Sequence, residues 1–219
     1  MKLGIFGSGS LGKEILSIIS SKVESWEEVF FIDDIVTERE INGIKVYRYQ
    51  EVKQFSAKEM EILIAVGEPY YREKIYLQVK SDGYNCATFV SDSAYIAHDC
   101  KLANGCVVFP NTYMGVNVSL EENVIIHAGA RIESDCNINR HSFISLGAFI
   151  GADTRIGRGS FVGPNSSIKD HLALGDYSVI GMGAVVIKDV ENEDVVVGNP
   201  AHFLRKNISK KVFNFSIIE

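Results

Sequence analysis

Large aliphatic residues recur at every sixth position between Val90 and Val186, and this period restricts the fold more than any other feature of the chain. The residue two places before each of them is mostly small. Because alternate residues of a strand point to the same side, each hexad directs one large and one small side chain inward. Three hexads then close a triangular coil, and stacked coils form a left-handed parallel β-helix of hexapeptide repeats. The aliphatic positions are Val90, Ile96, Leu102, Val108, Met114, Leu120, Ile126, Ile132, Ile138, Ile144, Ile150, Ile156, Val162, Ile168, Leu174, Ile180 and Val186.

A β-sandwich is the alternative fold, but its strands would not keep an exact six-residue register over this length. The period also explains three of the four cysteines, Cys100, Cys106 and Cys136, because they occupy the small inward position. We therefore expect them to pack in the core and expect no metal site. The predicted domains are an α/β Rossmann-like domain at 1–85, the all-β helix at 86–200 and a C-terminal tail at 201–219.

One outward face of the predicted β-helix is apolar along its whole length. An apolar surface of this extent on a soluble protein marks an interface, and a triangular prism favours contacts that close by rotation. The sequence therefore predicts a homotrimer formed through this apolar stripe. The alternative is that the N-terminal domain covers it. The apolar stripe consists of Phe89, Val107, Ile125, Phe143, Phe161 and Val179.

The turns of the coil fall into three corners of different polarity. A groove between the two less polar corners of adjacent subunits would suit a long, partly apolar ligand. The apolar corner holds Pro110, Ala128, Leu146, Pro164, Met182 and Pro200. The mixed corner holds His98, Val116, Ser134, Ala152, Asp170 and Lys188. The polar corner holds Asn104, Glu122, Arg140, Arg158, Asp176 and Asp194. A second outward face, the mixed face, carries Tyr95, Tyr113, Arg131, Phe149, Ser167 and Val185.

Strands and helices alternate before the repeats, which indicates a parallel α/β sheet. The expected elements are strands at Lys2–Phe6, Val29–Ile32 and Glu61–Val66, helices from about Leu11 and about Tyr70, and a last strand near Thr88.

A glycine-rich loop at Gly7–Gly12 fits the pattern G-x-G-x-x-G in its required place between strand and helix. Asp33 and Asp34 follow the second strand, where a carboxylate can accept hydrogen bonds from ribose hydroxyls. The domain is too short for a complete dinucleotide fold, so a mononucleotide such as that of a nucleotide-sugar fits better than NAD. A purely structural loop is the alternative.

The composition excludes several other classes of function. The net charge of −6 argues against nucleic-acid binding. No apolar run approaches the ~20 residues of a membrane span, and the first residues do not form a signal peptide. We therefore expect a cytoplasmic protein.

The chain resembles the bacterial sugar acyltransferases that include sialic acid O-acetyltransferases and the bacillosamine N-acetyltransferase. The resemblance covers residues 1 to 206 and rests on the order of GSGSLGKEIL, FIDD, IAVGEPYYREKI, the repeats, IGMGAVVIKDV and GNPA. It implies acetyl-CoA as donor, a trimer, and active sites between subunits, with the nucleotide of the acceptor held by the N-terminal domain. The expected nucleotide-binding residues are Gly7, Ser8, Gly9, Asp33, Asp34 and Gly67. The expected donor-binding residues are Phe143, Ala152, Pro164, Met182 and Gly183.

The chain departs from this family at the general base. The family's His-acid-Cys segment corresponds here to Ser134, Asp135 and Cys136, and its second histidine corresponds to Phe143. Serine alone cannot accept a proton near neutral pH. We therefore consider His127, Ser134 and Asp135 as catalytic candidates, with His127 the favoured base. His98 and His141 are less favoured alternatives.

An amine that arrives neutral needs no strong base to attack a thioester, because proximity supplies much of the rate. The sequence therefore predicts transfer of an acetyl group from acetyl-CoA to an amino, or else a hydroxyl, group of a nucleotide-linked sugar in surface-glycan biosynthesis. The alternatives are a sugar-binding or regulatory homologue that has lost catalysis, and acyl transfer to a non-sugar molecule such as an amino acid.

Overall fold

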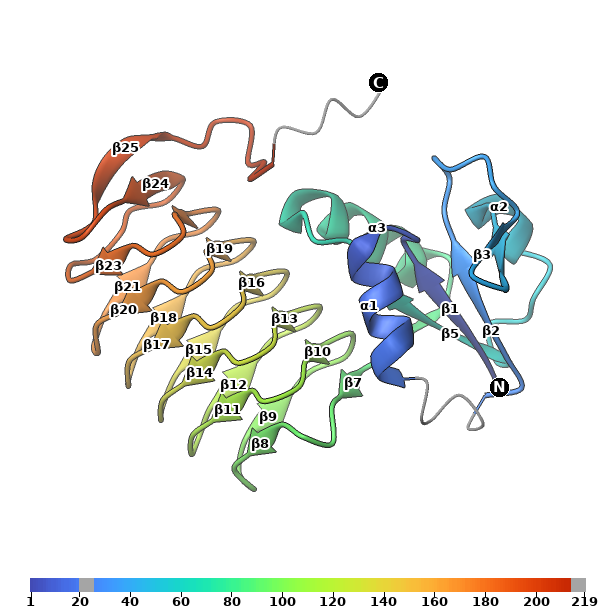
Figure 1. The fold of residues 1–219 in the computed structure, drawn as a ribbon, viewed down its shortest axis with the longest axis horizontal. Coiled ribbons are helices and arrows are strands. Elements are labelled where there is room, and N and C mark those ends of the chain that lie inside the picture. Colours follow the sequence, from blue (N-terminus) through green and yellow to red (C-terminus); the bar gives the residue numbers. More distant parts are fainter. Residues whose placement is uncertain (20–25, 214–219) are drawn as a thin grey trace.

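The computed structural model describes residues 1–19 and 26–213 of the chain. Part of the predicted tail, residues 214–219, and residues 20–25 of the predicted first domain lie outside the described residues. An α/β domain packs along one side of a long β-helix, and a strand at His202–Lys206 pairs onto the C-terminal end of that helix (Figure 1). Among the described residues, no helix is long and apolar enough to cross a membrane.

The N-terminal domain is built around a six-stranded sheet of order β3-β4-β2-β1-β5-β6, in which only β3 is antiparallel to its neighbour. The hairpin β3–β4 and the short helix α2 were not predicted. The last strand, expected near Thr88, ends at Cys86. The elements in chain order are β1 (Lys2–Phe6), α1 (Ser10–Ile19), β2 (Glu28–Ile32), β3 (Glu40–Ile41), β4 (Ile44–Tyr47), α2 (Tyr49–Val52), β5 (Met60–Ile64), α3 (Pro69–Ser81) and β6 (Asn85–Cys86).

The predicted β-helix is confirmed, with strands of successive coils paired in parallel at a spacing of 18 residues, as in Val107 with Ile125. Three sheets form its sides. The first contains β7 (Phe89–Val90), β10 (Val107–Val108), β13 (Ile125–Ile126), β16 (Phe143–Ile144), β19 (Phe161–Val162), β22 (Val179–Ile180), β24 (Asp194–Val197) and β25 (His202–Lys206). The second contains β8 (Tyr95–Ile96), β11 (Tyr113–Met114), β14 (Arg131–Ile132), β17 (Phe149–Ile150), β20 (Ser167–Ile168) and β23 (Val185–Val186). The third contains β9 (Lys101–Leu102), β12 (Ser119–Leu120), β15 (Asn137–Ile138), β18 (Arg155–Ile156) and β21 (Ala173–Leu174).

The core of the β-helix consists of the residues that the six-residue period selects. Every aliphatic residue of the period lies in one hydrophobic cluster or packs directly against it. Cys106 and Cys136, at small inward positions, are part of the same cluster, and Cys100 packs against it. The cysteine thiols donate to backbone carbonyls of neighbouring turns, as in Cys106 to Glu121 across 3.0 Å. Burial raises the pKa of the Cys106 thiol to about 11, so this side chain is a packing residue.

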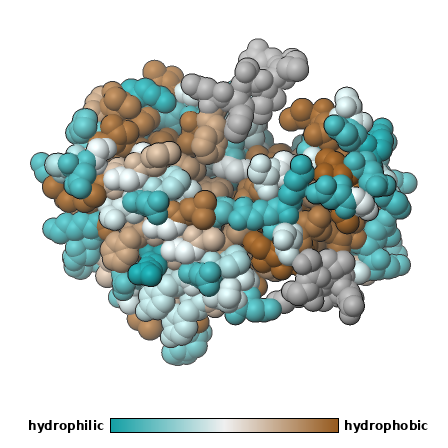
Figure 2. Space-filling model, viewed as in Figure 1, coloured by the Kyte–Doolittle hydropathy of each residue, from teal (hydrophilic) through white to brown (hydrophobic). Residues whose placement is uncertain are grey.

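The apolar stripe does not face another subunit, which corrects the trimer contact predicted from it. Five of its residues are buried within the single chain, namely Phe89, Val107, Ile125, Phe143 and Phe161. They share a hydrophobic cluster with residues of α1 and of the parallel sheet, and helices α1 and α3 lie between that sheet and the β-helix (Figure 1). Hydrophobic residues gather where the two domains meet (Figure 2). The stripe is an interface, but its partner is the N-terminal domain, because the domain must bury the apolar faces of its own helices.

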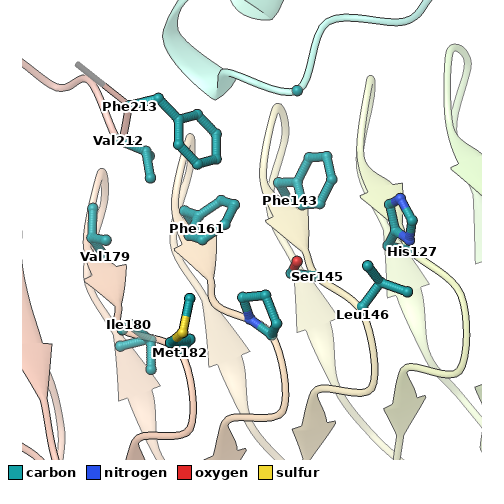
Figure 3. Close-up of a pocket in the computed structure, with 13 residues that line it drawn as sticks. His127, Phe143, Ser145, Leu146, Phe161, Val179, Ile180, Met182, Val212 and Phe213 are labelled. Carbon is teal, nitrogen blue, oxygen red and sulfur yellow. The ribbon is translucent and has the colours of Figure 1, made fainter. Parts of the chain in front are cut away.

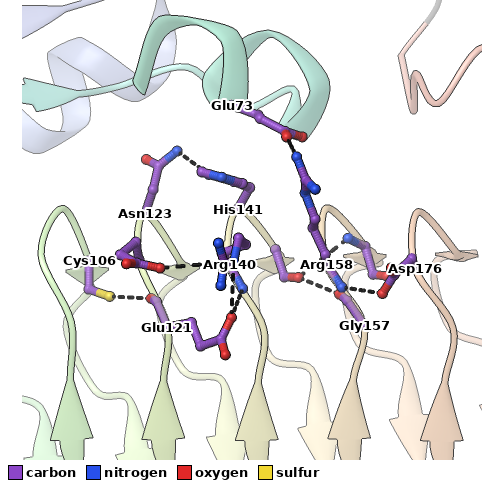
Figure 4. A network of polar contacts seen from close by, with 12 residues as sticks. Glu73, Cys106, Glu121, Asn123, Arg140, His141, Gly157, Arg158 and Asp176 are labelled. Carbon is purple, nitrogen blue, oxygen red and sulfur yellow. Dashed lines mark hydrogen bonds and ion pairs between the residues drawn. The ribbon is translucent and has the colours of Figure 1, made fainter. Parts of the chain in front are cut away.

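Polar contacts also join the two domains (Figure 4). The guanidinium of Arg72 on α3 is fully buried and donates to backbone carbonyls of both domains. Glu73, one residue on, forms an ion pair with Arg158 of the polar corner and accepts a hydrogen bond from Tyr177 at 3.2 Å. These contacts fix the position of the N-terminal domain on the first sheet of the β-helix.

Candidate functional site

The glycine loop lies at the carboxyl end of the parallel sheet, where ligands bind in open α/β folds. Gly7 has a φ of +105°, and a side chain there would meet the carbonyl of Ala65 at 2.7 Å. A Cβ at Gly12 would meet the carbonyl of Gly7 at 2.0 Å. A Cβ at Gly9 would meet nothing within 4 Å. Gly7 and Gly12 are therefore required by the loop itself, whereas Gly9 faces open space that a ligand can enter.

Asp33 holds the loop in shape. One of its carboxylate oxygens accepts hydrogen bonds from the Ser8 amide at 2.9 Å and the Ser8 hydroxyl at 2.6 Å. The other accepts from the amides of Ile35 and Val36. Although burial opposes it, these hydrogen bonds hold the pKa of Asp33 below its usual value. Asp34 is exposed, and its Oδ1 accepts the amide of Tyr49 at 2.8 Å.

Gly67 connects this sheet edge to the β-helix. It follows β5, the neighbour of β1, and a Cβ at this position would lie 3.9 Å from Leu11 and 4.0 Å from Phe143. The nucleotide-binding residues expected from the sequence therefore lie at or next to the carboxyl end of the sheet. They are Gly7, Ser8, Gly9, Asp33, Asp34 and Gly67.

A cavity of about 370 Å³ lies between the domains and against the first sheet, and Gly67 is one of the residues that line it (Figure 3). It contains three of the predicted donor-binding residues, Phe143, Pro164 and Met182, together with His127. Gly183 is on the same turn as Met182 but does not line the cavity, and Ala152 lies on the mixed corner, elsewhere on the prism. Ser145, also in the lining, was not singled out from the sequence, because a serine one residue after a hexad's aliphatic position has no distinguishing pattern.

The C-terminal segment forms one wall of the cavity, which the sequence did not predict. Val212 and Phe213 line it, and the Phe213 ring packs edge-on against Phe161 with 5.3 Å between ring centroids. The buried carboxylate of Glu68 holds this segment by accepting the backbone amides of Val212 at 3.0 Å and Phe213 at 2.8 Å. The same carboxylate accepts the amide of Tyr70 at the start of α3.

His127 is a buried residue on the apolar corner. Its ring stacks on Phe109, with 4.3 Å between centroids and 9° between planes. Its Nδ1 accepts the amide of Ala128 at 2.9 Å, and its Nε2 lies 3.4 Å from a carboxylate oxygen of Glu14 on α1. Burial lowers the pKa of His127, and Glu14 offsets only part of that effect, so the imidazole is neutral near pH 7.

The other catalytic candidates lie elsewhere in the chain. Ser134 and Asp135 are on the mixed corner, where Asp135 is exposed and its Oδ1 accepts a hydrogen bond from Asn117 at 2.8 Å. A single subunit therefore does not bring them to His127. His141 is buried between the domains, and its Nδ1 lies 2.9 Å from the side-chain amide nitrogen of Asn123. Burial lowers its pKa to about 3, as expected for a packing residue.

Comparisons with known proteins agree with this architecture. Residues 2–79 match the model of the PglD N-terminal domain, and residues 153–188 match that of the bacterial transferase hexapeptide repeats. The GDP-perosamine N-acetyltransferase of Escherichia coli O157:H7 is 22% identical over 199 residues, which cover 89% of this chain and 82% of that protein.

Two solved structures extend the likeness to nearly the whole chain. The acetyltransferase domain of PglB from Neisseria gonorrhoeae FA1090, solved in complex with acetyl coenzyme A, has a TM-score of 0.88 and 26% identity, and the match covers 93% of this chain and 98% of that one. WeeI from Acinetobacter baumannii AYE has a TM-score of 0.88 and 25% identity, and the match covers 93% of this chain and 100% of that one. The chain thus combines a PglD-type N-terminal domain with bacterial transferase hexapeptide repeats and is homologous to bacterial sugar N-acetyltransferases.

Proposed function

We propose that this protein transfers an acetyl group from acetyl-CoA to the amino group of a nucleotide-linked sugar, a reaction of surface-glycan biosynthesis. The observation that carries the proposal is that Gly67 joins two sites: it lies next to Leu11 of the glycine loop, and it lines the cavity that contains His127. A nucleotide on the loop would direct its sugar toward the cavity. The names of the relatives, a GDP-perosamine N-acetyltransferase and an acetyltransferase domain solved with acetyl coenzyme A, support the two substrates.

The mixed face supplies the subunit contact in this proposal. Tyr95, Tyr113 and Phe149 are 61%, 40% and 38% exposed, and the two tyrosine rings stack with 5.3 Å between centroids. The second sheet that carries them is flanked by the apolar corner on one side and the mixed corner on the other. Closed packing of this face in a homotrimer would therefore bring the two corners of neighbouring subunits together.

The trimer would also explain why the site residues lie on two corners. His127, Pro164 and Met182 would come from one subunit, and Ser134, Asp135 and Ala152 from its neighbour. A groove between them would hold the extended pantetheine arm of the donor, which has the partly apolar character that these corners share.

Release of coenzyme A thiol tests the proposal. The protein is mixed with acetyl-CoA and, one at a time, with nucleotide-linked amino-sugars, and each is paired with its hydroxyl counterpart as a control. We expect thiol release above the hydrolysis background with one amino-sugar and much less with its counterpart. Tight binding of such a sugar without any thiol release would instead support the non-catalytic homologue.

A further inference from the structure

The contact between Glu14 and His127 joins the two halves of the proposed site. Glu14 is on α1, the helix that starts at the glycine loop, and 44% of its side chain is exposed. His127 is in the β-helix and lines the cavity. The carboxylate oxygen and Nε2 lie 3.4 Å apart, and catalytic hydrogen bonds are often this long before substrate binds.

The hydrogen bonds of His127 determine which nitrogen carries its proton. Nδ1 accepts the Ala128 amide, so its lone pair is occupied. A neutral imidazole has one protonated nitrogen, which is then Nε2, and this N–H points at Glu14. Neither ring nitrogen is left to take a proton from a substrate. In this arrangement His127 is a hydrogen-bond donor, and the free proton acceptor of the pair is the carboxylate.

The position of Glu14 also suits an acceptor held by the glycine loop. Gly12 and Glu14 are on the same turn of α1, and Leu11 on that turn lies against Gly67, which lines the cavity. A sugar that extends from the loop toward the cavity must therefore pass beside this turn. The sequence pattern gave no sign of this role, because a single glutamate in an amphipathic helix is usually a solvated residue.

We propose that Glu14 accepts the proton of the attacking amine and that His127 orients the Glu14 carboxylate through its Nε2–H. This inference rests on the proposed acetyl transfer. The amine nitrogen attacks the thioester carbon, the new C–N bond forms, and the nitrogen gains a positive charge. Its proton passes to Glu14. The C–S bond then breaks, the coenzyme A thiolate leaves with the electron pair, and the proton on Glu14 returns to solvent or to that thiolate.

Substitutions of the two residues test the assignment, each with acetyl-CoA and the best amino-sugar found by thiol release. We expect Glu14→Ala to lower kcat by about 10²-fold or more, the usual contribution of a positioned proton acceptor, with little change in the KM of acetyl-CoA. Added formate should restore part of that rate, and Glu14→Asp should keep more of it than Glu14→Ala. His127→Gln should lower kcat by less than Glu14→Ala does, and formate should not restore the kcat of His127→Gln. Glu59→Gln, which removes an exposed carboxylate of the same domain, is the control and should behave like the unsubstituted protein.

Two results would overturn the proposal. One is a larger loss in His127→Gln than in Glu14→Ala, with rescue by imidazole, which would make the histidine the base. The other is a near-normal kcat in Glu14→Ala. A readout independent of transfer separates this inference from the proposed function. Nitrogen-15 NMR of the His127 ring in the unsubstituted protein should show a neutral imidazole protonated on Nε2, and a proton on Nδ1 would contradict the pair even if no acceptor were found.

Discussion

Arg72 donates a hydrogen bond from its guanidinium to the backbone carbonyl of His141 across 2.7 Å, and so ties helix α3 to the β-helix. The same group donates to four more backbone carbonyls, those of Asn123, Val66, Gly67 and Ser142. Burial lowers the pKa of Arg72 to about 9, so the side chain is still charged at neutral pH. A buried cation whose hydrogen bonds go to backbone carbonyls of both domains can act as a rigid joint between them.

Replacement of Arg72 should therefore destabilise the whole molecule. In Arg72→Met the carbonyls lose their buried donor, and we expect the free energy of unfolding to fall by about 3 kcal/mol. The stability of Arg72→Lys should lie between those of the unsubstituted protein and Arg72→Met, because an ammonium group cannot reach all five carbonyl acceptors. Urea denaturation provides the measurement, and Arg39→Met, at an exposed ion pair, is the matched control. Equal stability of Arg72→Met and Arg39→Met would show that the joint contributes nothing.

Acid should destabilise the protein through His141. Its pKa is lowered to about 3 in the folded protein by burial and by Arg72 and Arg140, whereas an unfolded histidine titrates near ~6.5. Below that pH the unfolded chain binds a proton that the folded chain excludes, so stability is lost as pH falls from 6.5 toward 3. The slope for one such group reaches about 1.4 kcal/mol per pH unit.

The variant His141→Asn isolates this effect. Asparagine tolerates the positive φ of 63° at this turn but does not titrate. Urea denaturation of both proteins from pH 8 to pH 4.5 should give a shallower slope for the variant, whatever its absolute stability. Parallel slopes would mean that His141 gains its proton without unfolding.

Subunit assembly should depend on the mixed face and not on the apolar stripe. Tyr113→Asp or Phe149→Asp would place a charge in the proposed contact, and burial of an unpaired charge is costly. Sedimentation should show monomers for these variants and trimers for Asn137→Asp, which is on the third sheet. Trimers in all three variants would exclude the mixed face.

Two substitutions in the glycine loop should have different effects, one on nucleotide-sugar binding and the other on stability. Gly9 faces open space, so Gly9→Val should fold normally but lose affinity for the nucleotide-sugar, because the new side chain occupies the approach to the backbone. Gly12→Ala should instead lower thermal stability, because its Cβ would overlap the Gly7 carbonyl. Calorimetry of binding and thermal melting distinguish the two, and unchanged nucleotide-sugar affinity in Gly9→Val would remove the loop from the substrate site.

The β-helix was predictable because its signal is local and repeated. The same six-residue step identifies each inward residue from Val90 to Val186, and in the structure all of them lie in one hydrophobic cluster or pack against it. The loop from Gly7 to Gly12 was predictable for the same reason, since the turn geometry restricts the residue types directly.

The partners of these elements were less predictable. An apolar stripe such as Phe143 with Phe161 indicates that something covers it but not what does, so the sequence favoured a second subunit over the N-terminal domain. Two interactions join segments far apart in the chain: the contact of Glu14 with His127, and the hydrogen bond that Glu68 accepts from the Phe213 amide. Such contacts depend on how the domains dock, which no local pattern specifies.

Transfer of a labelled acetyl group to a nucleotide-linked amino-sugar tests the central claim most directly. The protein is incubated with acetyl-CoA labelled with carbon-13 in its acetyl group and with the amino-sugar that binds most tightly, and the products are read by mass spectrometry and NMR. We expect a sugar that carries one labelled acetyl group in amide linkage to its amino nitrogen, formed only with the protein present. Recovery of unmodified amino-sugar, under conditions where it and acetyl-CoA are both shown to bind, would contradict the proposed function.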